Sequence, residues 1–206
     1  WLLLVLALLP VPGVGRAQEP PGDIVFTHPE YQYQLKLRPE WKAVANFDLD
    51  KPGHVLIEIP SLPSERLELM VIANQWNVTA LEWVEYLAQI VPYPTEIINR
   101  MLIVDGLPTV VQKWQTDEPE ATGISYIVDA GDYFLLLVVQ PDTLYQAPEI
   151  QYLLSRLSLR GLRQKRLAAS ERISTGLLQP SSPDSASATD WKLPWQKGQK
   201  YYFTGG

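Results

Sequence analysis

The chain has 206 residues, of which 17 are basic and 23 acidic, with two histidines and no cysteine. The lack of cysteine excludes a thiol nucleophile, a disulfide framework and a cysteine-ligated zinc site, and two histidines leave little basis for a histidine-rich metal site. The net charge of −6 argues against nucleic-acid binding through the overall field of the protein.

Residues 1–17 have the features of a secretory signal peptide without its first residues. An apolar run extends from Leu2 to Leu9, proline and glycine follow, and Gly15 and Ala17 stand at positions −3 and −1 of a cleavage site. The run is shorter than the roughly 20 apolar residues that a membrane-spanning helix needs. We therefore expect an extracytoplasmic protein with no transmembrane span after cleavage. The alternative is a buried N-terminal strand.

Four strands are predicted next. DIVFTH and YQYQLKL alternate apolar and polar residues, which is typical of half-buried strands. HVLIEIP follows, and then RLELMVIANQW, whose apolar content predicts a central strand covered on both faces. SLPSE between them is a loop. We expect Trp41 to fill the core at a turn, and His28 and His54 to be ordinary surface residues rather than a base or a ligand.

A helix is predicted from about residue 79 to residue 91. Thr79 is in place for an N-cap, and Glu82 three residues later completes a capping box. Apolar residues then recur at near-helical spacing until Pro92 ends the run. The triplet Asn77-Val78-Thr79 also matches an N-glycosylation sequon, although the capping role already accounts for its threonine.

The remaining pattern predicts two hairpins and a second helix. RMLIVDG turns at Gly106 into LPTVVQKWQTD, and residues 129–132 supply the turn inside ATGISYIVDAGDYFLLLVVQP. APEIQYLLSRLSL closes the unit as a helix. Its apolar face comprises Ile150, Leu153, Leu154 and Leu157. The order predicts an α+β fold in which one antiparallel β-sheet is flanked by two helices.

No arrangement of polar residues predicts catalysis in this unit. The acid groups Asp117/Glu118/Glu120 and Asp129/Asp132 fall at predicted turns, where aspartate caps the backbone and stays solvated. A catalytic triad lacks both a G-x-S-x-G elbow and a well-placed histidine, and no Walker-type loop occurs. We therefore expect no catalytic residue, no metal ligand and no cofactor in this chain.

A family resemblance covers roughly residues 24–160. YQYQLKLRPEWKAV, the helix VTALEWVEYLAQI, the strand pair ending in GDYFLLLVVQP and the closing helix together resemble the PsbP-like/DcrB family of α-β-α sandwiches. The resemblance assigns residues 18–160 to one such domain and implies a secreted or lumenal accessory domain without catalysis. It rests on pattern and order, so no functional residues carry over.

Residues 161–190 begin with a basic segment and continue as a Ser/Pro-rich linker. LLQPSSPDSASATD has little to bury and predicts a disordered, exposed linker. The basic residues just before it are Arg160, Arg163, Lys165, Arg166 and Arg172. One interpretation is a solvated helix end whose cations oppose the helix dipole. The other is a contact to an anionic envelope polymer or to lipid headgroups.

The last residues, WKLPWQKGQKYYFTGG, combine a turn, a polar spacer and a strand. They resemble the first strand of lysostaphin-type (LytM-like) zinc endopeptidases. The residues at the expected spacing are Leu193, Pro194, Trp195, Gly198, Thr204, Gly205 and Gly206. In that family the zinc ligands follow the glycine pair, so residues 191–206 would be the first strand of a truncated peptidase-like domain and zinc would be bound only beyond it. The alternative is a disordered or self-associating tail.

Together these expectations describe the N-terminal, non-catalytic part of a secreted cell-envelope zinc metallopeptidase of the peptidoglycan endopeptidase type. Its accessory domain would position the peptidase against a cell-wall polymer or an envelope protein. The alternative is a non-enzymatic secreted binding or assembly module, in which the PsbP/DcrB-like domain is the whole function.

Overall fold

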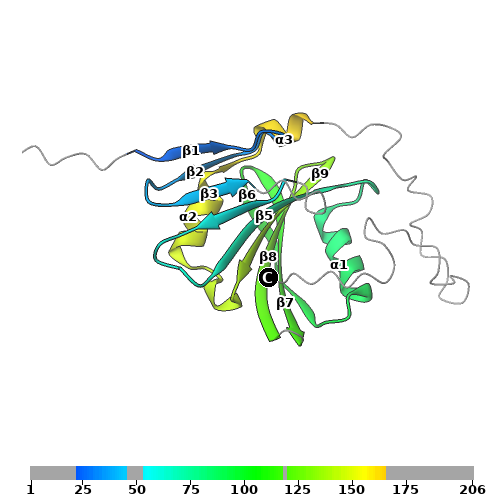
Figure 1. The fold of residues 1–206 in the computed structure, drawn as a ribbon. Coiled ribbons are helices and arrows are strands. Elements are labelled where there is room, and N and C mark those ends of the chain that lie inside the picture. Colours follow the sequence, from blue (N-terminus) through cyan, green and yellow to red (C-terminus); the bar gives the residue numbers. More distant parts are fainter. Residues whose placement is uncertain (1–21, 46–52, 118–119, 166–206) are drawn as a thin grey trace, which may run out of the picture.

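The computed structural model describes residues 22–45, 53–117 and 120–165, which form an α+β fold (Figure 1). The strands are β1 Ile24–Thr27, β2 Gln34–Leu37, β3 Lys42–Ala45, β4 Val55–Glu58, β5 Arg66–Ala73, β6 Thr95–Val104, β7 Leu107–Asp117, β8 Glu120–Asp129, β9 Tyr133–Gln140 and β10 Leu157–Ser158. The helices are α1 Ala80–Ile90, the 3₁₀ turn η1 Asp142–Leu144, α2 Pro148–Arg156 and α3 Arg160–Gln164.

Seven strands form one antiparallel sheet in the order β3-β4-β5-β9-β8-β7-β6, and β1, β2 and β10 form a small three-stranded sheet. The central strands β5 and β9 pair over their whole length, from Arg66 opposite Gln140 to Ala73 opposite Tyr133. Every residue of β9 except Gln140 is buried. This burial explains the nearly unbroken apolar sequence of β9, because a strand covered on both faces has no solvated side.

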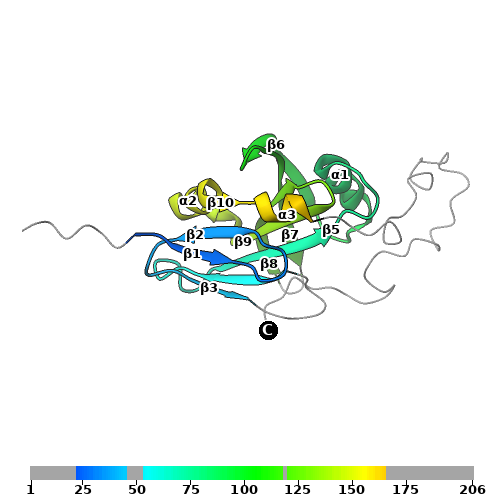
Figure 2. The same cartoon turned by 90° about the horizontal axis from the view of Figure 1, so that it is seen from above.

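Apolar clusters cover both faces of the large sheet. On one face, Trp83 of α1 packs with Phe134 of β9. The other face is covered by α2, the small sheet and α3, which pack against the alternate residues of the same strands. The fully or almost fully buried members of this cluster include Ile150, Leu35 and Leu135. In Figures 1 and 2, α1 and α2 lie apart, with strands of the large sheet between them. The expected sheet flanked by two helices is confirmed, and the small sheet is an additional part of one layer.

Three local expectations are confirmed. The Thr79 hydroxyl accepts the backbone N–H of Glu82 and the Glu82 carboxylate accepts the backbone N–H of Thr79, so the capping box is complete. α1 ends before Pro92. Turns at residues 105–106 and 130–132 connect the strands of the two predicted hairpins.

The expectation that both histidines lie at the surface is wrong. His28 and His54 are each 2% exposed. The ring of His28 stacks on Tyr33 with 5.1 Å between centroids, and its Nδ1 accepts the backbone N–H of Tyr31 at 3.1 Å. Burial is the main cause that lowers the pKa of His28. Local partners of this kind let a histidine be buried in its neutral form, which the short strand pattern does not reveal.

Two further details differ from the sequence prediction. The closing helix ends at Arg156, because Leu157 and Ser158 instead pair with the edge of β2. Leu157 remains in the core. Asp132 lies at the predicted turn but is only 5% exposed, so the expectation that it stays solvated is wrong. Its carbonyl accepts the backbone N–H of Asn74, which brings the loop after β5 against this turn.

The folded part continues past residue 160, where the sequence predicts a boundary. α3 lies within the predicted basic segment, and its Leu162 is fully buried in the core. The predicted signal peptide at residues 1–17, the segment from residue 166 to 190 and the peptidase-like residues 191–206 lie outside the described residues. Within the described ranges, no helix has the length and apolar character needed to cross a membrane.

Candidate binding surface

The outer side of β2 carries cations because the strand alternates. Leu35 and Leu37 are buried in the core, whereas Lys36 between them and Arg38 just after them are exposed. Successive side chains of a strand point to opposite faces, so Lys36 and Arg38 share the outer face. Two positive charges are therefore presented two residues apart along one strand.

Aromatic side chains hold Arg38 in place. Its guanidinium carbon lies 4.8 Å from the ring centroid of Tyr152 and 5.2 Å from that of Trp41. The two rings meet edge to face at 5.2 Å, and Trp41 is 4% exposed, as expected of a residue that fills the core at a turn. Stacking on ring faces is a geometry that a planar guanidinium favours. Arg38 is nevertheless exposed, so an anion can reach it.

A third cation, Arg156, shares the ring of Tyr152. Its guanidinium carbon is 5.6 Å from the ring centroid. The Tyr152 hydroxyl donates to the Asp23 carboxylate at 2.6 Å, and Arg156 Nε lies 4.0 Å from the same carboxylate. Desolvation first, and then Asp23, raise the pKa of Tyr152. Asp23 thus offsets part of the positive charge at this end of the surface.

The pairing of β10 with β2 brings the end of α2 beside β2. Leu157, which directly follows Arg156, lies opposite Leu35 in antiparallel register. Arg160 follows β10 at the start of α3 and is exposed. We call Lys36, Arg38, Arg156 and Arg160 the cationic face. Among the described residues, no carboxylate lies within ion-pair distance of Lys36, Arg38 or Arg160.

α3 is held against the end of β2. A Cβ at Gly161 would overlap the backbone carbonyl oxygen of Gln32, two residues before β2, so glycine permits this close approach. Figures 1 and 2 both show α3 at this end of the small sheet. The exposed Arg160 therefore lies near the start of β2, at the end opposite Arg38.

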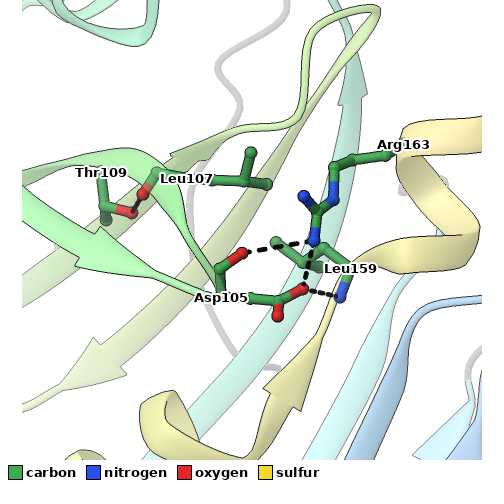
Figure 3. A network of polar contacts seen from close by, with 5 residues as sticks. All are labelled: Asp105, Leu107, Thr109, Leu159 and Arg163. Atoms are coloured by element: carbon green, nitrogen blue, oxygen red, sulfur yellow. Dashed lines mark hydrogen bonds and ion pairs between the residues drawn. The ribbon is translucent and has the colours of Figure 1, made fainter.

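The other predicted polyanion contacts are engaged within the fold or lie outside the description. Arg163 Nη2 donates to the Asp105 carboxylate at 3.0 Å and to its backbone carbonyl at 3.3 Å (Figure 3). Lys165 Nζ lies 3.6 Å from a Glu30 carboxylate oxygen and 4.4 Å from the ring centroid of Tyr31. Arg166 and Arg172 lie outside the described residues. Of the five basic residues singled out from the sequence, only Arg160 belongs to the cationic face.

Sequence reasoning missed the other three members of this face. The alternation in QLKLR contains the signal for Lys36 and Arg38, because it separates them from the buried leucines. No local signal identifies Arg156, since its place depends on β10 pairing with a strand far back in the chain.

A separate polar cluster is buried beside β4 and β5. His54 Nε2 lies 3.5 Å from a carboxylate oxygen of Glu68, and Arg66 Nε donates to the other oxygen. Burial alone would raise the pKa of Glu68, but the nearby His54 and the hydrogen-bonded, charged Arg66 outweigh it and hold the pKa below its usual range. The side chains of His54 and Glu68 are at most 3% exposed. A substrate does not reach groups buried to this extent, so the cluster acts within the fold.

The acidic groups singled out from the sequence lie, where described, at the ends and turns of hairpins. Asp117 and Glu120 are exposed at the end of the β7–β8 hairpin, and Glu118 lies outside the described residues. Asp129 accepts the backbone N–H groups of Ala80 and Gly131. No group of three or more histidine, aspartate or glutamate side chains in the described ranges is arranged to hold a metal ion.

Comparisons with known proteins find similarity to solved structures only. It matches no known family profile and no curated protein at a significant level. The solution structure of cyanobacterial PsbP (CyanoP) from Synechocystis sp. PCC 6803 is 13% identical with a TM-score of 0.44, and the match covers 73% of this chain and 98% of that one. A crystal structure from Bacteroides thetaiotaomicron VPI-5482 is 9% identical with a TM-score of 0.43, over 68% of this chain and 49% of the other. A PsbP structure is thus among the structural neighbours, and similarities this low carry no argument about function.

Proposed function

We propose that residues 22–165 form a non-catalytic binding module that attaches to an anionic polymer of the cell envelope. The observation that carries this proposal is the cationic face: Lys36, Arg38 and Arg160 have no acidic partner among the described residues, in a chain whose acidic residues outnumber its basic ones. Unpaired cations gathered on one side of an acidic protein create a local field that attracts anions.

A finer proposal concerns what the module serves. The resemblance of residues 193–206 to the first strand of LytM-like zinc endopeptidases supports an accessory role in an exported peptidoglycan peptidase. In this proposal the described domain holds no cofactor, and zinc belongs to ligands that would follow Gly206. The signal-like residues 1–17 support the extracytoplasmic location. The second candidate is a secreted binding module that serves no peptidase, which the same cationic face supports equally.

Binding to an anionic polymer tests the main proposal. We expect the full chain to bind polyphosphate in low salt, with an affinity that falls as salt is added. The double variant Lys36→Gln/Arg160→Gln removes two unpaired cations, and the affinity should fall by about 30-fold, if each cation contributes ~1 kcal/mol.

The matched control is Lys42→Gln/Arg100→Gln. It removes one lysine and one arginine that already face Glu58 at 4.0 Å and Glu85 at 2.8 Å and that do not belong to the cationic face. The control should change the affinity by less than about threefold, because exposed paired charges add little. The proposal would be contradicted if the two double variants lost the same amount of affinity for polyphosphate, or if the wild-type chain did not bind it.

Two observations test the finer proposal. In the gene, the codons after Gly206 should encode Pro-His, followed later by an aspartate and an H-x-H pair; their absence there refutes the peptidase part. N-terminal sequencing of the exported protein should give a start near Gln18, and a start far from it contradicts the signal-peptide assignment.

A further inference from the structure

We infer that the cationic face binds a linear polyanion lengthwise along β2, with the guanidinium of Arg38 as the fixed contact at one end and Arg160 at the other. This inference rests on the proposed function. It adds the shape of the ligand, the direction in which it lies and the residue that anchors it.

The cations form a row rather than a cluster around one point. Lys36 and Arg38 follow one another on the outer face of β2, Arg156 directly precedes the strand β10 that pairs with β2, and Arg160 follows β10 near the start of β2. At a strand rise of ~3.3 Å per residue, the distance along the chain from Arg38 to Gln34 is roughly 13 Å. A single small anion contacts only part of such a row. A chain with repeated negative charges contacts all of it.

Arg38 is the best-defined contact in the row. Two rings fix its guanidinium, so binding an anion there costs less side-chain entropy than ordering a free lysine. The planar fork of N–H donors also matches a phosphate or carboxylate group in a bidentate manner. Lys36 and Arg160, which have no such support among the described residues, contribute mainly as charges.

A narrow polymer fits the face better than a flat anionic membrane does. Asp23 lies next to Arg156, Asp105 lies beside Arg163 of α3, and Glu30 lies beside Lys165 just after it. A membrane plane would approach these carboxylates together with the cations, and like charges repel. A polymer that follows the row contacts three cations without an acidic partner among the described residues and only one, Arg156, that lies near a carboxylate.

A length series tests the lengthwise arrangement. The probes are tripolyphosphate and polyphosphate chains of increasing defined length, and the full chain is titrated with each. The affinity should rise by about tenfold or more until the probe spans the row, and the slope of log K against log salt should approach about −3 for four neutralised charges on a flexible polyanion. Vesicles that contain phosphatidylglycerol, supplied at equal accessible phosphate, should bind more weakly than the long chain.

Variants of Arg38 and Tyr152 test the anchor. Arg38→Lys keeps the charge at an exposed position, and we expect the affinity for long polyphosphate to fall about threefold, because the stacked fork is lost. Tyr152→Leu keeps all four cations but removes one of the two rings that contact Arg38, which Arg156 also contacts, and we expect the affinity to fall by a similar factor. Tyr152→Phe keeps the ring and loses only the hydroxyl bond to Asp23, so its affinity should stay within about twofold of wild type. Arg38→Lys decides the matter if Tyr152→Leu does not fold.

The outcomes separate this inference from the proposed function. If the wild-type chain binds no polyphosphate of any length, the proposed function fails. If it binds, but tripolyphosphate binds as tightly as the long chains or Arg160→Gln leaves the affinity unchanged, the function stands and the lengthwise arrangement is wrong. Tighter binding to the vesicles would identify lipid headgroups as the ligand and would also overturn the inference. Equal affinities of the Tyr152→Leu and Tyr152→Phe variants would remove Arg38 as anchor.

Discussion

The carboxylate of Asp105, in the turn between β6 and β7, accepts the backbone N–H of Leu159 at 2.7 Å. The same carboxylate binds Arg163, so the tip of one hairpin is tied to both the start and the body of α3 (Figure 3). Asp105 and Gly106 have φ values of 48° and 73°. This left-handed pair is the geometry of a two-residue hairpin turn in which aspartate followed by glycine is favoured.

Asp105→Ala should destabilise the protein by about 2 kcal/mol, because it leaves the N–H of Leu159 unpaired and puts alanine at a positive φ. Asp105→Asn retains an acceptor and tolerates the same φ, so it should lower the free energy of unfolding by about half as much as Asp105→Ala. Arg163→Ala should cost less than about 1 kcal/mol, since that side chain is 42% exposed. Urea unfolding of the three variants measures these differences. An Asp105→Asn variant as unstable as Asp105→Ala would show that the ion pair, not the bond to Leu159, holds the turn.

The capping box of α1 gives a second prediction. Thr79→Ala removes the acceptor for the N–H of Glu82, and the free energy of unfolding should fall by about 1 kcal/mol. Thr79→Ser keeps the hydroxyl and should stay within about 0.5 kcal/mol of wild type. The box also lowers the pKa of Glu82, chiefly through the backbone hydrogen bond from Thr79. If Thr79→Ser lowered the free energy of unfolding as much as Thr79→Ala does, the stabilisation would come from the methyl group of Thr79 and not from the cap.

The features that the sequence predicts well depend on residues close together in the chain. Thr79 and Glu82 complete their box within one helical turn, and the Asp129–Asp132 turn is encoded by four consecutive residues. The burial of His54 depends instead on Glu68, which lies on the next strand and fixes it only once β4 and β5 pair. Strand alternation alone does not say which polar positions find a buried partner.

The cationic face likewise combines residues that the local sequence identifies with residues that only the fold brings together. Lys36 and Arg38 were predictable as neighbours on an exposed face, because the leucines between and beside them mark the buried side. Arg156 joins them through β10, a two-residue strand that the helical pattern of APEIQYLLSRLSL conceals. Arg163 looks like a free cation in the sequence, and only the fold brings Asp105 to it.

Gly123 provides a test of packing. It lies opposite Trp114 in the β7–β8 pair, and a Cβ there would overlap the indole ring, with Cη2 at 2.8 Å. Gly123→Ala should therefore displace the buried ring, weaken its 3.0 Å bond from Nε1 to Ser125 Oγ and destabilise the protein by about 1–3 kcal/mol. Gly22→Ala is the control, because nothing lies within 4 Å of a Cβ at that site. Equal unfolding midpoints for the two variants would contradict this account.

The buried carboxylate of Glu68 predicts a pH-dependent stability. Its pKa in the folded state lies below the ordinary value of 4.5, because His54 and Arg66 outweigh the desolvation that would raise it. A carboxyl whose folded pKa is depressed stabilises the fold above its unfolded pKa, and this contribution is lost as the pH falls through the folded value. Glu68→Gln should therefore be less stable than wild type at pH 7 by about 3 kcal/mol, the scale of a broken buried ion pair.

The difference between wild type and Glu68→Gln should narrow as the pH falls below 4.5, when the wild-type carboxyl also becomes neutral. Urea unfolding of both proteins at a series of pH values from 7 downward measures this. Glu58→Gln is the matched control: Glu58 is 64% exposed and lies 4.0 Å from Lys42, so its loss should cost less than about 0.5 kcal/mol at every pH. A constant gap between wild type and Glu68→Gln across the acid range would mean that the shape of the side chain, and not its charge, is what β4 and β5 require.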